Sequence, residues 1–267
     1  MLIATAFCVA CKQKGGSNVA GPVPTDTLET ATVSVVLDTI LRAPYALEVN
    51  LEMEYVTDVR LSEEVRRKIN SEIIVGCLGD DYAGAQIDEI QPRVTEDLVA
   101  QFGEFLWEDG SEDLFLDGFD ENHETVYSSW HLVSAVGYEA PKGYISYTLG
   151  GDEYHYGAAH GYYYIGSMLF DLATGNLVHE DDLFVEGYRP KLTELLETYV
   201  VNFEYYEEDF LLVDSIEPND NFSVNEDGIT YFFNPYEITA YAYGIVDITI
   251  PWDALKEILK PDLNFTF

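Results

Sequence analysis

Residues 45–55 alternate between large apolar side chains and small or polar ones, and this period of two limits the fold more than any other feature. The apolar positions are Tyr45, Leu47, Val49, Leu51, Met53 and Tyr55, and the positions between them are Ala46, Glu48, Asn50, Glu52 and Glu54. Successive side chains of a β-strand point to opposite sides of the sheet. The segment is therefore predicted to be a half-buried strand, with one face in a core and the other in water.

Four other segments show the periodicity of amphipathic helices. Ser62 is predicted to cap the first, because its hydroxyl can accept a hydrogen bond from the first turn, and Glu63 and Glu64 suit the positive end of the helix dipole. The apolar stripes are Val65, Ile69 and Ile73 in the first helix; Leu98, Val99, Phe102, Phe105 and Leu106 in a second that begins at Thr95; Leu192, Leu195, Leu196, Tyr199 and Phe203 in a third that begins near Pro190; and Leu255, Ile258 and Leu259 in a fourth that Pro251 opens.

From Thr125 onward the chain is rich in β-branched and aromatic runs, which are typical of antiparallel strands. The runs cover residues 127–138, 143–149, 162–172, 177–179, 222–233 and 245–250. Turn residues at 173–176 and 225–228 predict hairpins, and alternation places Tyr163 on the opposite face from Tyr162 and Tyr164. Because strands cluster with helices interspersed, the predicted fold is α+β: a mainly antiparallel sheet with packed helices, in two intertwined subdomains.

The first eleven residues are typical of a lipoprotein signal peptide. Ten apolar and small residues end at Cys11, and the residues before this cysteine resemble the lipobox of bacterial lipoproteins. Ten residues cannot span a bilayer as a helix, but they fit a signal-peptide core. We therefore expect lipidation at Cys11, a flexible tether over residues 12–30 and a location outside the cytoplasmic membrane. Removal of the leader would leave Cys77 as the only cysteine besides Cys11, and Cys77 is predicted to pack as a small hydrophobic residue.

The charge of the chain excludes several classes of partner. Its 49 Asp and Glu residues against 13 Lys and Arg residues give a formal net charge of −36. Nucleic acid binding requires a basic surface, and the same negative field repels anionic lipid headgroups, so membrane association is expected only through the anchor. Basic proteins or peptides and divalent cations remain as partners. The charge also suits a soluble monomer with no further role.

No pattern of catalytic residues or metal ligands stands out. Asp152, Glu153, His155 and His160 lie close in sequence, but on a strand the two histidines would face opposite sides, so a zinc site is not expected. Residues 217–227 offer oxygen ligands for calcium without matching a known loop pattern. The 20 tyrosines suit either a sheet core or a carbohydrate-binding platform. We predict no catalytic residue, no metal and no cofactor, and hence no enzyme activity.

Several C-terminal motifs resemble a known domain. They are Asn234-Pro235-Tyr236-Glu237 followed by Ile250-Pro251, together with His160-Gly161 upstream and the segment from Asp171 to Gly175. This pattern is similar to domain of unknown function 3298, which the RsiV anti-sigma factors and PdaC peptidoglycan deacetylases share. The resemblance covers about residues 154–259, so residues 154–267 are predicted to form this domain. Residues 31–153 resemble the α/β segment that precedes it in the PdaC-like proteins.

The resemblance implies an extracytoplasmic binding or sensing module. The RsiV-like member is a lysozyme receptor, and the catalytic domain of the deacetylase has no counterpart here. Recognition of a basic protein such as lysozyme is therefore the first hypothesis, and the acidic composition agrees with it. Peptidoglycan or glycan binding is the alternative, and an accessory role in a cell-wall hydrolase or deacetylase comes last.

Overall fold

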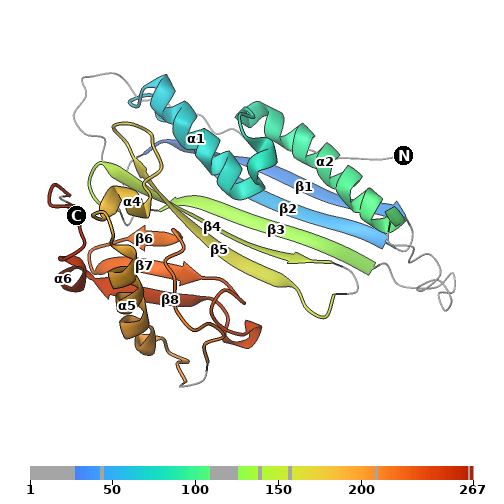
Figure 1. The fold of residues 1–267 in the computed structure, drawn as a ribbon. Coiled ribbons are helices and arrows are strands. Elements are labelled where there is room, and N and C mark those ends of the chain that lie inside the picture. Colours follow the sequence, from blue (N-terminus) through green and yellow to red (C-terminus); the bar gives the residue numbers. More distant parts are fainter. Residues whose placement is uncertain are drawn as a thin grey trace.

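The chain forms an α+β structure of two sheets with helices packed against them (Figure 1). The structure is a computed structural model, and it describes residues 28–42, 45–108, 126–137, 140–155, 158–207, 210–263 and 265–266. Cys11 and most of the predicted tether lie outside the described residues. Among the residues described, no helix is long and apolar enough to cross a membrane.

The larger sheet has five long strands in the order β1-β2-β3-β4-β5. They are β1 (Thr30–Arg42), β2 (Tyr45–Val56), β3 (Val126–Gly137), β4 (Tyr144–Tyr154) and β5 (Tyr162–Asp171). Neighbouring strands pair antiparallel except β2 and β3, which run parallel. A parallel pair requires a crossover connection. The two long helices lie in that connection.

Helices α1 (Glu63–Leu78) and α2 (Ile87–Glu108) cover one face of this sheet (Figure 1). The predicted cap is confirmed, since the Ser62 side chain accepts a hydrogen bond from the Val65 nitrogen at 3.2 Å. The odd-numbered apolar residues of β2 point toward the helices: Leu47, Val49, Leu51 and Met53 are all at most 2% exposed. The half-buried strand inferred from alternation is thus confirmed. Cys77 is also buried in this core, as expected.

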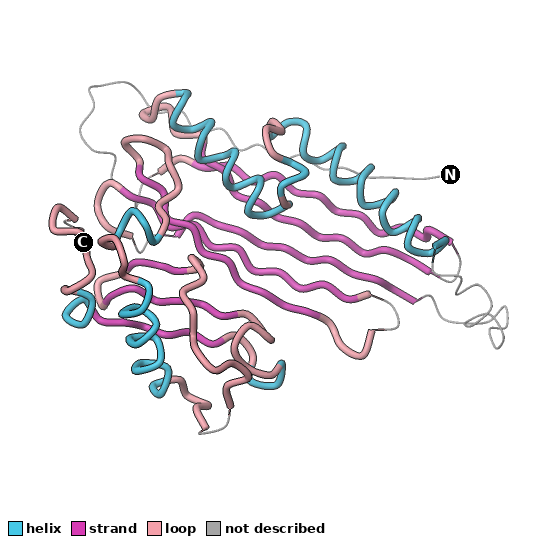
Figure 2. The backbone as a smooth tube through the Cα atoms, in the orientation of Figure 1, coloured by secondary structure: helices cyan, strands magenta, loops and turns pink. Residues whose placement is uncertain are grey.

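The smaller sheet is antiparallel and contains β6 (Phe222–Val224), β7 (Gly228–Phe233) and β8 (Val246–Pro251) (Figure 2). The predicted hairpin at residues 225–228 joins β6 to β7. The short helix α4 (Glu180–Leu183), α5 (Arg189–Tyr199) and the short α6 (Trp252–Leu255) surround this sheet. Three 3-10 turns complete the described elements: η2 (Asp80–Tyr82), η3 (Val200–Asn202) and η4 (Tyr241–Tyr243).

The two sheets meet at β5. Tyr164, Met168 and Phe170 of this strand pack with the core under α1 and α2, whereas Leu169 packs with the core of the smaller sheet. Alternation along one strand therefore supplies both cores. The position of β5 makes it the structural link between the N-terminal lobe and the C-terminal lobe.

One strand was not expected, and three expected elements differ from the structure. Strand β1 was not predicted at all, because Val36 and Ile40 are apolar but exposed and so hide its alternation. Helix α2 begins at Ile87 rather than Thr95, with Pro92 inside it. Residues 177–179 form one isolated bridge instead of a strand, and the closing helix is a single turn. The side chains of Phe102, Phe105 and Leu106 lie outside the described part.

Candidate functional site

Four aromatic side chains gather where the two lobes meet, and we call His160, Tyr163, Tyr236 and Tyr241 the aromatic cluster. Tyr241 is its centre: its ring stacks on His160 with centroids 4.0 Å apart, lies 5.8 Å from the ring of Tyr236 and meets Tyr163 edge to face at 5.3 Å. The hydroxyl of Tyr236 lies 3.0 Å from Nε2 of His160. The cluster joins β5, the residues before it and two segments between β7 and β8.

The hydrogen bonds of His160 fix its ring in the cluster. Its Nδ1 lies 2.8 Å from the carbonyl oxygen of Gly161, and because a carbonyl can only accept, Nδ1 must carry a proton. In a neutral ring Nε2 then accepts the hydroxyl hydrogen of Tyr236. Gly161 suits this position, since a Cβ there would lie 3.0 Å from the backbone oxygen of Glu153, which is a tight contact.

Tyr236 is displayed by a tight turn of the Asn-Pro-Tyr-Glu motif. The nitrogen of Asn234 donates to Oε2 of Glu237 at 3.0 Å, and the nitrogen of Glu237 donates to the oxygen of Asn234 at 3.0 Å. These bonds hold Tyr236 at φ +73, a left-handed conformation that is unfavourable for a tyrosine. Its side chain is nevertheless 54% exposed. The turn thus holds an aromatic ring in water at the cost of backbone strain.

Carboxylates lie near two tyrosines that neighbour the cluster in sequence. Burial, followed by the charges of Glu237 and Glu153, raises the pKa of Tyr162, which precedes Tyr163. The hydroxyl of Tyr243, two residues after Tyr241, donates to Glu207 at 3.3 Å, and burial together with this carboxylate raises the pKa of Tyr243. We call Glu153, Glu207 and Glu237 the acidic rim. An aromatic surface with this rim offers both ring faces and negative charge to a ligand.

Two asparagine side chains connect the smaller sheet to the free edge of β5. Asn234 accepts from the nitrogen of Ile165 at 2.8 Å and donates to its oxygen at 3.1 Å. Asn221 accepts from the nitrogen of Ser167 at 2.9 Å and also donates to the oxygen of Ile165 at 3.1 Å. These amides replace the next strand of the sheet, because they satisfy backbone groups that an edge strand leaves open. The link places the Tyr236 turn firmly beside β5.

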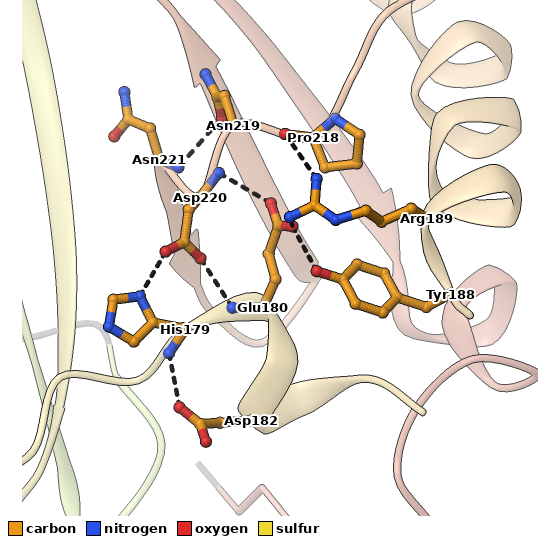
Figure 3. Close-up of polar contacts among 9 residues, drawn as sticks. All are labelled: His179, Glu180, Asp182, Tyr188, Arg189, Pro218, Asn219, Asp220 and Asn221. Carbon is orange, nitrogen blue, oxygen red and sulfur yellow. Dashed lines mark hydrogen bonds and ion pairs between the residues drawn. The ribbon is translucent and has the colours of Figure 1, made fainter. Parts of the chain in front are cut away.

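A buried network of polar groups fixes the loop that carries Asn221 (Figure 3). Glu180, at the start of α4, is only 2% exposed. Its carboxylate accepts from the hydroxyl of Tyr188 at 2.8 Å and from the nitrogen of Asp220 at 2.9 Å, and Arg189 lies 3.4 Å away. Asp220 in turn accepts from the nitrogen of Glu180 at 2.8 Å. The carboxylate of each acidic residue therefore accepts a hydrogen bond from the backbone nitrogen of the other.

His179 completes this network at the surface. Its Nδ1 lies 2.5 Å from Oδ2 of Asp220, and this hydrogen bond is the largest cause that raises the pKa of His179. Burial and the nearby Glu180 carboxylate raise the pKa of Tyr188, so its hydroxyl remains a donor. The adjacent Asn219 donates to Oε2 of Glu237 at 3.2 Å. Through Asn219 the network also supports the turn that displays Tyr236.

The structure separates the predicted site residues into two groups. His160, Gly161, Tyr236 and their neighbours Asn234, Pro235 and Glu237 meet at the aromatic cluster. Asp171 and Gly175 instead shape the hairpin after β5, where Gly175 has φ +74 and a Cβ would lie 2.7 Å from the backbone oxygen of Val65. Pro251 ends β8 and precedes α6. This second group lies outside the cluster and supports the fold.

Within the part of the chain that the structure describes, no group of three or more His, Cys, Asp or Glu side chains could hold a metal ion. The expectation that His155 and His160 lie on opposite faces of one strand is wrong, because β4 ends at Tyr154 and β5 begins at Tyr162. His160 instead contributes its ring to the aromatic cluster.

Sequence reasoning missed Tyr163 and Tyr241 as cluster members, and Glu180 and Asp220 as its support. The alternation of residues 162–164 did place Tyr163 on the correct face, away from Tyr162 and Tyr164, whose rings stack on each other. Tyr241 stands seven residues after Asn234, within the motif region, but its contact with His160 spans the whole C-terminal lobe. Only the folded arrangement brings the two rings together.

The chain is similar to proteins whose function is not established. Residues 181–253 match the family described as "Protein of unknown function (DUF3298)". A solved structure of a member from Bacteroides fragilis has a TM-score of 0.76 and 24% identity, over 90% of this chain and 96% of that one. A second, from Pseudomonas aeruginosa, has a TM-score of 0.58 and 13% identity, over 92% and 100%.

No protein of curated function matches the sequence. The match within residues 181–253 contains the Asn-Pro-Tyr-Glu turn, α5 and all three strands of the smaller sheet. At these levels of identity the two solved structures show a shared fold. Residues 181–253 therefore resemble the DUF3298 family, and the chain shares its overall fold with two solved structures of that family.

Proposed function

We propose that this protein is an extracytoplasmic binding module, lipid-anchored through Cys11, whose aromatic cluster and acidic rim recognise a basic protein. The observation that supports this most is the exposed ring of Tyr236, held in a left-handed conformation beside three further aromatic side chains. Strained backbone persists only where surrounding contacts maintain it, and it concentrates at functional sites. A ring held in this way is well suited to contact a partner.

The chemistry of the site favours a cationic group on that partner. Arginine and lysine side chains bind over tyrosine faces, at about 0.5–2 kcal/mol for each contact. Glu153, Glu207 and Glu237 add negative charge near tyrosines that neighbour the cluster, and the net charge of −36 would steer a basic protein toward the surface. A lysozyme-like partner has this chemistry. The similarity to RsiV-like receptors supports the same class of partner.

Calorimetric titration with lysozyme at low ionic strength tests the proposal. We expect binding that weakens steeply as salt is added, because exposed charges are screened beyond about 10 Å at 0.1 M salt. Tyr241→Ala should weaken it about tenfold, since Tyr241 contacts every other ring of the cluster. Tyr205→Ala is the matched control, because Tyr205 is an exposed tyrosine outside the cluster. Absence of binding heat, or equal loss in both variants, would contradict the proposal.

Binding of a peptidoglycan glycan is the second candidate. The stacked rings of His160 and Tyr241 and the exposed ring of Tyr236 could each support a sugar face. Such binding would depend little on salt. Sedimentation with insoluble peptidoglycan in low and high salt separates the two candidates, because only glycan binding should persist at high salt.

A further inference from the structure

Among the residues that the structure describes, helices cover the five-stranded sheet on one face only. Figure 1 shows both α1 and α2 on the same face of the sheet, and the odd-numbered residues of β2 from Leu47 to Met53 share a core with these helices. The C-terminal lobe packs near Tyr144 and Leu169, at one end of the opposite face. The remainder of that opposite face is a broad surface made by β1 to β4, and we call it the open face.

The register of the strands shows which side chains share the open face. Val36, Asn50, His131, Asp152 and Tyr163 stand opposite one another on five successive strands. This row of side chains ends in Tyr163, which belongs to the aromatic cluster. The other members of the open face are Asp38, Ile40, Glu48, Glu52, Tyr127, Ser129 and Val133.

Large apolar side chains are exposed on this face. Val36 and Ile40 are each 62% exposed, Val133 is 58% exposed, and Tyr127 is 42% exposed. Single exposed apolar residues are common on protein surfaces, but several on one uncovered sheet face are typical of an interaction site. Val36 and Ile40 also interrupt the apolar–polar alternation from which β1 could have been predicted. These exposed apolar side chains are not needed for the core of the sheet.

Carboxylates stand between these apolar residues. His131 lies between two of them, with Nδ1 3.1 Å from Asp152 and Nε2 3.7 Å from Glu48, and both carboxylates are more than half exposed. Asp38 and Glu52 are also exposed on the same face. Among the strand residues with described side chains, His131 is the only basic group there. The open face is therefore both apolar and acidic.

We propose that the open face is a docking surface for a basic polypeptide in which lysine or arginine side chains are interspersed with apolar ones. Charge complementarity selects this occupant. A second copy of the chain would bring identical carboxylates together, and anionic lipids or nucleic acid would be repelled for the same reason. The partner class rests on the proposed function, but the surface is distinct from the aromatic cluster.

The size of the surface suggests that one partner uses both regions. Four strands about 4.8 Å apart, over eight residues of about 3.3 Å each, span roughly 500 Å². A stable protein interface buries about 800 Å² on each partner. The open face alone falls short of this area, and the aromatic cluster continues it through Tyr163. A folded basic protein can cover both, whereas a short peptide can occupy the open face alone.

A short peptide of alternating lysine and leucine tests the open face directly. Its affinity for the full chain should fall about tenfold in Glu48→Gln/Asp152→Asn, because two exposed carboxylates that would pair with lysines are removed. The matched control is Asp88→Asn/Glu96→Gln on α2, which changes the total charge equally on the helix side of the sheet. We expect this control to retain affinity within about twofold. Val133→Ser should also weaken binding, and the exposed Val59→Ser should not.

Lysozyme titrations in the same variants separate this inference from the proposed function. If the chain binds no peptide, or if the two double variants lose affinity equally, the open face is not a docking surface. Lysozyme binding that is lost in Tyr236→Gly but unchanged in the open-face variant would contradict the inference and leave the proposed function intact. Peptide binding that depends on the open face, with lysozyme binding insensitive to Tyr236→Gly, supports the inference and contradicts the proposed function.

Discussion

Asp220 and Tyr236 share a rare backbone conformation but use it in opposite ways. Among the described residues, they alone combine a side chain other than glycine with a positive φ, at +60 and +73. Asp220 uses its carboxylate within the fold, where it accepts from His179 and from the nitrogen of Glu180. Tyr236 instead presents an exposed ring. The hydrogen bonds of Asp220 offset its backbone strain of about 1–3 kcal/mol, whereas we propose that the same strain at Tyr236 serves recognition.

Replacement of Asp220 should give the largest loss of stability. Asp220→Gly permits the positive φ but removes the acceptor for two hydrogen bonds, one of which serves the nitrogen of Glu180. We expect the free energy of unfolding to fall by about 2–3 kcal/mol, as measured by urea denaturation. Asp220→Asn keeps an acceptor oxygen and tolerates this conformation, so it should lose less. Equal stability of Asp220→Gly and the unmodified chain would show that Asp220 is not a structural residue.

Replacement of Asn234 should lower both the stability of the fold and the affinity for lysozyme. Asn234→Ala removes both hydrogen bonds to Ile165, which join the Tyr236 turn to β5. The free energy of unfolding should fall by about 1–2 kcal/mol, and lysozyme affinity should fall with it because the turn loses its support. Denaturation and calorimetry on one preparation measure the two effects. A loss of stability with full affinity would show that the link does not position Tyr236.

A smaller effect should appear in the pH dependence of stability. The hydrogen bond to Asp220 raises the pKa of His179, so the pair adds stability that is fully present below the unfolded pKa of about 6.5. This contribution is lost as the pH rises through the higher folded pKa. His179 is 53% exposed, so screening should limit the effect to less than about 1 kcal/mol.

The pH effect is measured as a difference between two proteins. Urea midpoints of the unmodified chain and of His179→Gln, at about pH 6 and about pH 9, separate the histidine from the response of the many carboxylates. We expect the advantage of the unmodified chain to shrink at the higher pH. An advantage that grows with pH would contradict the assigned role of His179.

The elements that the sequence predicted correctly are those that depend on neighbouring residues. Ser62 and its helix, the alternation of residues 45–55 and the hairpin at 225–228 all follow from local geometry. Helix α2 was placed too far along the chain because the segment around Pro92 disfavours a helix, yet Ile90 and Val94 are buried against the sheet. Burial in the core outweighed the local preference.

The missed features depend on distant parts of the chain. The parallel pairing of β2 with β3 joins strands on either side of two helices, and no local pattern specifies it. Likewise, the ring of His160 stacks on Tyr241 because Asn234 places its turn beside Ile165. The motif residues could be named from the sequence. Their convergence with Tyr163 and Tyr241 could not.

Substitution of Tyr236 by glycine tests the account most directly. Glycine adopts φ +73 without strain, which offsets the lost ring contacts, so the free energy of unfolding should stay within about 1 kcal/mol. Calorimetric titration with lysozyme at low ionic strength should nevertheless show affinity at least about tenfold weaker for Tyr236→Gly. Unchanged affinity in the stable variant would contradict the assignment of the aromatic cluster as the recognition site.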